Sequence, residues 1–121
     1  MDLMTRTAWG PLALLHLAPA LPALRPALVE RLYGVAPDGD VGVLLVHRGA
    51  LFAAVMAAAL FALVSPEARK LASVVVAISM AGFLLVYLRA GMPAGALRKI
   101  AVADVVGLVP LAFVLWEAWG R

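Results

Sequence analysis

Residues 41–64 read VGVLLVHRGALFAAVMAAALFALV and form the strongest apolar run of the chain. Its only strongly polar residues are His47 and Arg48, both near its start. An α-helix rises about 1.5 Å per residue, so about 20 apolar residues cross a hydrocarbon layer about 30 Å thick. The stretch therefore predicts a transmembrane helix.

The composition indicates that the whole chain is suited to lipid. Of its 121 residues, 65% are hydrophobic and only 14% are charged. A soluble domain is typically about half apolar and about a quarter charged, and a chain of this length could not bury so much apolar surface in water. We therefore expect one integral membrane domain, residues 1–121, in contact with the lipid bilayer.

Three further apolar runs predict the other helices. Ser65, Pro66 and Glu67 follow the order of an N-cap, a first-turn proline and an acid favoured by the helix dipole. Gly91 and Pro93 mark the end of that helix. The expected fold is an all-α, integral membrane four-helix bundle with spans at about residues 8–24, 41–64, 71–90 and 100–119.

The first of these segments is the least regular. It holds His16 and three prolines, which predicts a kinked span. An alternative is a cleaved signal peptide, since Arg6 precedes an apolar stretch and small residues follow around Ala18-Pro19-Ala20. Next, residues 26–33 mix apolar and charged side chains, which is typical of a short interfacial helix. This helix would connect the first two spans.

An even number of spans places both ends of the chain on the same membrane face. Trp9 would lie there with Trp116 and Trp119, because tryptophan favours the membrane interface. The basic residues divide almost equally between the two faces, so the positive-inside rule leaves the orientation open. The net charge of +3 comes without a dense basic stripe, which argues against nucleic acid as a partner.

Polar residues within the predicted spans gather towards one end. From the helical rise, Arg48 lies roughly 10 Å, Asp104 roughly 6 Å and His16 roughly 12 Å from the same membrane face. A charge in hydrocarbon costs a few kcal/mol, so Arg48 needs a partner or water. We expect it to interact with Asp104. The pair could serve packing alone or form the floor of a pocket, or each side chain could reach the headgroups separately.

A ligand pocket at this end would have six candidate residues. They are Arg48 and Asp104 as its floor, with His16, His47, Tyr33 and Arg89 as its walls. The expected ligand is lipid-like or quinone-like. His16 and His47 also suit a bis-histidine haem, although hydrogen-bonded structural histidines are the commoner arrangement. No third ligand stands nearby, so a metal site is not expected.

Cysteine content and small residues add two constraints. The chain has no cysteine, which excludes disulfides, thiolate metal sites, iron–sulfur clusters and covalent c-type haem.

Small residues recur every four positions, as at Gly49, Ala53 and Ala57, and such rows let membrane helices approach closely. They predict packing within the bundle or a surface for a homo-oligomer. Phe52 and Phe83 are expected to pack or to face lipid.

Four short stretches, spread over most of the chain, carry a family resemblance. They are Leu15-His16-Leu17-Ala18-Pro19, Leu32-Tyr33-Gly34-Val35, His47-Arg48-Gly49-Ala50-Leu51-Phe52 and Arg98-Lys99-Ile100-Ala101-Val102-Ala103-Asp104-Val105-Val106. In them the chain resembles the small bacterial DoxX-like four-helix membrane proteins, especially an uncharacterised group of similar length. The resemblance implies the same fold and a bacterial inner membrane.

Members of that group are often labelled phosphopantetheine adenylyltransferase. That soluble enzyme has a nucleotide-binding α/β fold with a His-x-x-His type motif. This sequence has no such motif, no glycine-rich phosphate loop and no alternating strands, so we do not expect that activity. The DoxX name is linked to quinone-coupled thiosulfate oxidation, and no redox motif is present here.

These observations leave three functional hypotheses. The first is a non-enzymatic accessory module that binds a lipid-like or quinone-like ligand, or a helix of a membrane partner subunit. The second is a redox subunit with quinone or b-type haem. The third is a small transporter that uses Asp104 as a proton or cation site. Both intramembrane charges lie in one leaflet, which argues against a continuous path.

Overall fold

The computed structural model describes residues 2–120, and every regular element within them is a helix. The long helices are α1 (Asp2–Leu15), α4 (Gly39–Val64), α5 (Arg69–Arg89) and α6 (Ala96–Trp119). Short helical pieces connect them: α2 (Leu17–Ala20), η1 (Leu21–Ala23), α3 (Leu28–Tyr33) and η2 (Pro66–Ala68). The predicted all-α class is therefore confirmed.

Three helical segments are long and apolar enough to cross a membrane: Gly39–Val64, Pro66–Arg89 and Ala96–Trp119. They coincide with the last three predicted spans, apart from a few residues at their ends. At most 28% of the most apolar window in each is buried within the protein. Many large aliphatic side chains on these helices are exposed, and water would solvate such a surface poorly. These features indicate a membrane protein.

The first predicted span, residues 8–24, is a broken segment. α1 already begins at Asp2, and His16 separates its end from α2. Pro19 and Pro22 lack a backbone N–H, so helical hydrogen bonding is interrupted there and the chain tightens into the 3-10 turn η1. The expected kink is present, but the segment starts earlier than predicted and is divided into short pieces.

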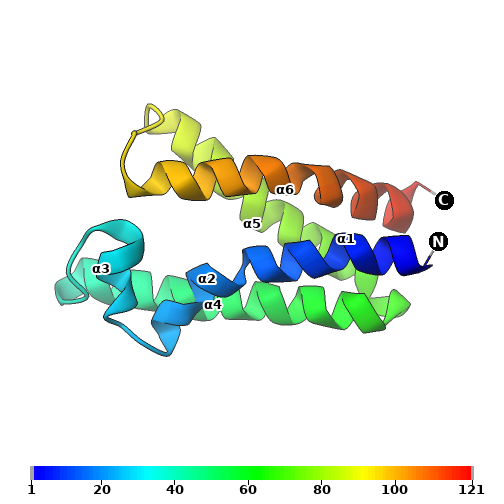
Figure 1. The fold of residues 1–121 in the computed structure, drawn as a ribbon, viewed down its shortest axis with the longest axis horizontal. Helices are drawn as coiled ribbons and strands as arrows, with labels where there is room; N and C mark the ends of the chain where they lie inside the picture. Colours follow the sequence, from blue (N-terminus) through cyan, green and yellow to red (C-terminus); the bar gives the residue numbers. More distant parts are fainter. Residues whose placement is uncertain (1, 121) are drawn as a thin grey trace.

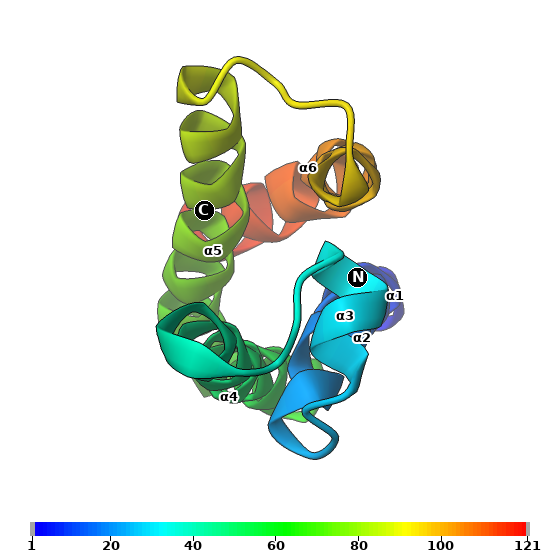
Figure 2. The same cartoon turned by 90° about the vertical axis from the view of Figure 1, so that its left-hand side faces the viewer.

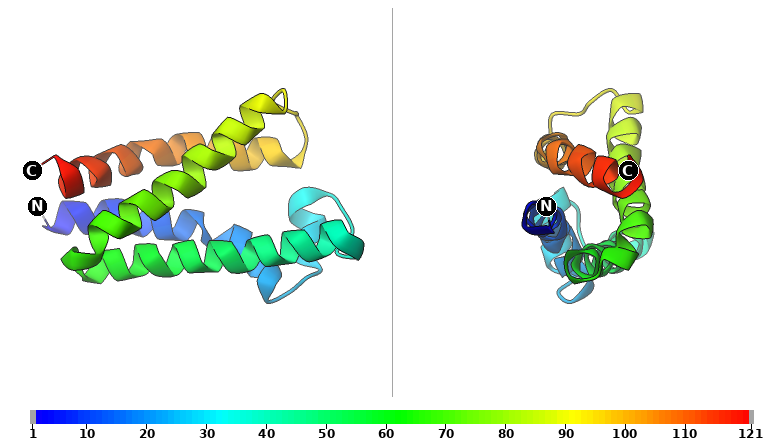
Figure 3. Two further views of the ribbon diagram at one scale, coloured as in Figure 1. Left: turned by 180° about the vertical axis from the view of Figure 1, so that it is seen from behind. Right: turned by 90° about the vertical axis from the view of Figure 1, so that its right-hand side faces the viewer.

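The long helices surround a common interior. α1 packs against α4 and α6, and α5 packs against the same two helices. Figure 1 shows α1 and α2 running alongside α4, with both chain termini at one end and α3 at the other. The view along the long axis shows the helices around a central region (Figure 2), and α5 crosses the others at an angle (Figure 3). The termini therefore lie together, as the predicted topology required.

One face of each helix is turned inward. On α6 the buried residues recur at every third or fourth position: Ala101, Asp104, Gly107, Leu111 and Val114. This spacing produces one continuous stripe along a helix. The stripe places the Asp104 carboxylate inside the protein and leaves the opposite face of α6 to its surroundings.

Trp9 is a central residue of the apolar core near the termini. It is fully buried, in one cluster with Leu12 and Val76. Trp9 thus lies at the end of the termini, as expected, but on the inward stripe of α1, so its side chain faces the core and not the lipid headgroups. Trp116 and Trp119 are exposed at the same end of the molecule, as expected of interfacial residues.

α4 approaches the broken first segment closely at Gly49. An added Cβ would lie 2.9 Å from the backbone nitrogen of Ala23 and 3.3 Å from the carbonyl oxygen of Ala20. Backbone atoms cannot move aside as a flexible side chain can, so the contact requires glycine. This is the packing role expected of the small residues, although Ala57 of the same row is exposed.

We expect Gly49→Ala to lower the free energy of unfolding by about 1–3 kcal/mol, because its methyl group overpacks the contact with η1. Gly82→Ala is the matched control, since no atom lies within 4 Å of a Cβ added there in α5. The control should be neutral or slightly stabilising, because alanine favours a helix over glycine. Thermal unfolding in detergent, followed by circular dichroism, measures both variants. Equal melting temperatures would contradict the close contact.

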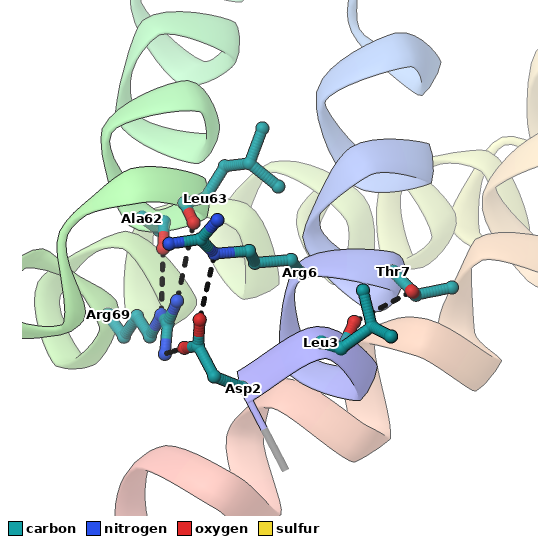
Figure 4. Close-up of polar contacts among 7 residues, drawn as sticks. All are labelled: Asp2, Leu3, Arg6, Thr7, Ala62, Leu63 and Arg69. Atoms are coloured by element: carbon teal, nitrogen blue, oxygen red, sulfur yellow. Dashed lines mark hydrogen bonds and ion pairs between the residues drawn. The ribbon is translucent and has the colours of Figure 1, made fainter.

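Arg69 joins three segments at the end where the termini lie (Figure 4). Its Nε donates to the carbonyl oxygen of Ala62 at 2.7 Å, and its Nη2 to that of Leu63 at 3.3 Å. These carbonyls belong to the last turn of α4, where carbonyls lack helical partners. Nη1 donates to Asp2 Oδ1 at 2.9 Å, and Arg6 pairs with the same carboxylate at 2.8 Å. The guanidinium therefore caps α4 and ties it to the start of α1.

The hydrogen bond from Arg69, with the added charge of Arg6, holds the pKa of Asp2 below its ordinary value. Ionised Asp2 then stabilises the fold at pH values above its unfolded pKa, about 3.9, and this contribution is lost as the pH falls through the lower folded value. The melting temperature of the wild type should therefore be higher than that of Asp2→Asn near neutral pH. The difference between the two melting temperatures should vanish in strong acid. In an Arg69→Gln background the substitution should have a smaller effect at neutral pH. A difference independent of pH would contradict this account.

Candidate functional site

Four inward-facing polar side chains lie at the end of the molecule that carries α3, while Thr5 and Ser73 are buried at the other end. His16 follows directly on the inward stripe of α1, and Asp104 lies on that of α6. Arg48 comes from the first half of α4, and Tyr33 is the last residue of α3. Four segments that are distant in the sequence therefore meet here, as Figure 1 shows for their helices.

Both ring nitrogens of His16 have partners, and the residue is 2% exposed. Nδ1 lies 2.8 Å from the carbonyl oxygen of Leu12, which can only accept, so Nδ1 carries a proton. In the neutral ring, Nε2 then accepts a hydrogen bond from the Ser79 hydroxyl at 3.0 Å. The His16 ring also lies 5.6 Å from that of Phe52, between centroids. These contacts link the end of α1 to α4 and α5.

Arg48 contacts aromatic rings. Its Nε donates to the Tyr33 hydroxyl oxygen at 3.2 Å. The guanidinium carbon lies 4.6 Å from the centroid of Phe52 and 5.4 Å from that of Phe83. Such cation–π contacts stabilise a desolvated guanidinium by about 2 kcal/mol. Nη2 of Arg48, however, is buried and has no hydrogen-bond partner.

Two cavities open beside these side chains. The smaller measures about 190 Å³ and is lined by His16 and Asp104, among others. The larger measures about 740 Å³, lies between α4, α5 and the start of α6, and contains Arg48 in its wall. Tyr33 and Phe52 line both cavities and so stand between them. The remaining wall of the larger cavity comes from Leu45, Leu51, Val55, Val75, Ile78, Ser79, Gly82, Phe83, Val86 and Leu97.

Arg48 and Asp104 lie at the same end without direct contact. Asp104 is 8% exposed on the inward face of α6. Within residues 2–120 no hydrogen bond or ion pair joins it to Arg48, although the guanidinium charge acts on it. The predicted interaction is thus a charge attraction across the interior, which is stronger in a medium of low polarity. Asp104 lines the smaller cavity and Arg48 the larger one.

His47 and Arg89 lie outside the site. Both are exposed, and neither lines the two cavities. His47 precedes Arg48 by one residue, so it is turned by about 100° around α4 and faces away from the interior. Arg89 is the last residue of α5. These two expected walls are therefore not part of the cavities, and His16 and His47 do not flank a common space for haem.

The other metal-ligating side chains are dispersed. Among the residues that the structure describes, no group of three His, Asp or Glu side chains could hold a metal ion. His16 and Asp104 line the smaller cavity together, but both His16 nitrogens are already engaged by protein groups. The site is therefore a polar patch set in apolar walls.

Sequence reasoning missed the aromatic residues around Arg48. Phe52 and Phe83 were expected only to pack or to face lipid. Phe52 stands four residues after Arg48, on the same face of one helix, and this spacing could have indicated the contact. Phe83 comes from α5, and no local signal in the sequence shows that it meets Arg48.

Comparisons with protein-family models, with curated proteins and with solved structures found no match to this chain.

Tyr33→Phe removes the hydroxyl that accepts from Arg48 and leaves a second donor of the guanidinium unsatisfied. We expect it to lower the free energy of unfolding by about 1–3 kcal/mol. In an Arg48→Met background the same substitution should cost much less, because the donor is gone. Unfolding of all four proteins in detergent measures this coupling. An unchanged cost in the second background would mean that the hydroxyl serves a group other than Arg48.

Proposed function

We propose that this protein is a non-enzymatic integral membrane module that binds a lipid-like or quinone-like ligand in the cavity beside Arg48. One observation carries the proposal: the buried Nη2 of Arg48 lacks a hydrogen-bond partner beside a cavity of about 740 Å³. In a bacterial inner membrane such a module would act as an accessory subunit for a membrane partner.

An unsatisfied donor inside a protein is costly. A buried N–H without an acceptor costs about 1–3 kcal/mol, and more when the group is charged. The rings of Phe52 and Phe83 offset part of the cost of burying the Arg48 charge. A ring face does not replace an acceptor in the guanidinium plane, where the N–H groups point. A carbonyl or ester oxygen of a ligand would complete the hydrogen bonding.

The size and lining of the cavity suit an amphiphilic ligand. Cavities for small molecules typically measure about 300–1,000 Å³ and combine apolar walls with a few polar groups. Here Arg48, Tyr33 and Ser79 supply the polar groups, and the other walls are aliphatic or aromatic. The polar head of the ligand would lie against Arg48. Its apolar part would follow the wall that Val75 and Ile78 supply from α5.

The membrane setting of the proposal rests on the outer surfaces of the helices. α4, α5 and α6 would cross the bilayer, and α1 continued by α2 and η1 would form the fourth crossing of a bundle, packed against α4. α3 exposes Glu30 and Arg31 while Val29 is fully buried, which is typical of a helix at the membrane surface. The resemblance to DoxX-like proteins supports the same arrangement.

Arg48→Met should release the ligand, because it removes the donors and the charge while keeping an unbranched side chain. Native mass spectrometry of protein purified in mild detergent should detect a retained lipid or quinone on wild type. We expect the occupancy of Arg48→Met to be at least tenfold lower. A tenfold change in affinity corresponds to the loss of about one hydrogen bond to a charged group. Arg98→Met is the matched control, since Arg98 is exposed and lines neither cavity. Equal occupancy on all three proteins would refute the proposal.

A further inference from the structure

The chain termini lie together at the opposite end of the molecule (Figure 3). A separate cavity of about 400 Å³ lies between the elements at that end. Its walls come from α1, η2, α5 and α6. The lining residues are Thr5, Trp9, Pro66, Glu67, Arg69, Lys70, Val114, Glu117 and Ala118. Unlike the cavity beside Arg48, it carries charged side chains of both signs.

Trp9 lines this cavity and carries an unsatisfied donor. Its side chain is fully buried, and its indole Nε1 has no hydrogen-bond partner. A buried tryptophan N–H usually finds an acceptor. Apolar neighbours such as Leu12, Val76 and Val114 share one cluster with Trp9 and offer no acceptor side chain. Trp9 also lines the polar cavity, so an acceptor bound there would lie beside its ring.

The charged residues of the wall differ in what they can still bind. Each guanidinium nitrogen of Arg69 already donates, to Ala62, Leu63 or Asp2, so Arg69 holds the wall in place. Lys70 is exposed, and its Nζ lies 5.0 Å from the centroid of Trp119. Glu67 is an exposed acid on the same wall, and Glu117 is a half-buried acid on the α6 side of the cavity. A ligand in this cavity can thus meet a cation and an anion side by side.

The cavity lies at the level where a membrane would end. α4 ends at Val64, α5 begins at Arg69 and α6 ends at Trp119, all at this end of the molecule. Trp116 and Trp119 are exposed here, as expected for an interfacial belt. Phosphate and ammonium groups of lipid heads occupy this depth, outside the hydrocarbon layer.

We propose that this cavity binds a phosphate ester that carries an ammonium group, the chemistry of a phosphoethanolamine head. A phosphate oxygen accepts from Nε1 of Trp9 and pairs with the ammonium of Lys70. The ammonium group of the ligand pairs with Glu67. This site is independent of the cavity beside Arg48, and neither site requires the other.

Native mass spectrometry in detergent, with defined probes, tests the site. The probes are dioleoyl phosphatidylethanolamine and dioleoylglycerol, which has the same chains and lacks the phosphate head. Wild type should bind the phospholipid at least tenfold more tightly than the diacylglycerol. Trp9→Phe should weaken phospholipid binding about tenfold, because it removes one hydrogen bond to a charged group and keeps an aromatic ring. Trp116→Phe makes the same change at an exposed position and should bind as wild type does.

Lys70→Gln is a second test that leaves the buried core untouched. If circular dichroism shows that Trp9→Phe does not fold, the result for Lys70→Gln tests the proposal. It should also weaken phospholipid binding about tenfold. Competition by soluble phosphoethanolamine would support the site and identify a free phosphate ester as a sufficient ligand, whereas binding of the phospholipid alone would support a lipid source. Because the esters of either probe could also bind beside Arg48, both probes are compared in the Arg48→Met background. The proposal is overturned if diacylglycerol binds as tightly as phospholipid there, or if folded Trp9→Phe and Lys70→Gln both bind as wild type does.

Discussion

A helix in an apolar setting can turn a polar side chain in only one direction without a large cost, which is towards the interior of the protein. In this molecule the constraint sets the rotation of the helices about their own axes. Asp104 lies on the inward stripe of α6, His16 follows on that of α1, and Arg48 reaches the interior from α4. With these groups turned inward, the outer faces carry mostly aliphatic side chains.

The two ends of the molecule satisfy their partly buried arginines in different ways. At the end of the termini, all three guanidinium nitrogens of Arg69 have acceptors, and the residue caps α4. At the α3 end, Arg48 rests on aromatic rings and one of its nitrogens has no acceptor. The first arrangement is complete within the protein and acts in stability. The second lacks an acceptor, and an adjoining cavity has room for one.

A packed layer lies between the two ends. Val76, Met80 and Leu111 belong to one buried cluster there, and the Met80 side chain fills the space beside Gly107, which has no side chain of its own. The hydrogen bond between His16 and Ser79 closes the α3 side of this layer. The polar groups of the two ends are therefore separated by apolar side chains, which suits two distinct binding sites better than one path through the protein.

Three features could be predicted from the amino-acid sequence: the positions of the long apolar helices, the break at the prolines of the first segment, and the location of Arg48, Asp104 and His16 at one end. These properties depend on hydrophobicity along the chain and on the fixed rise of a helix. The folded structure was needed to show that Arg48 meets Phe83 and not Asp104, that Trp9 faces inward, and that His47 faces outward. Contacts between helices depend on their rotation and separation, which close approaches such as Gly49 against Ala23 set to within a few tenths of an ångström. A sequence pattern fixes the face of a helix, whereas the partner across the interior depends on packing of the whole set.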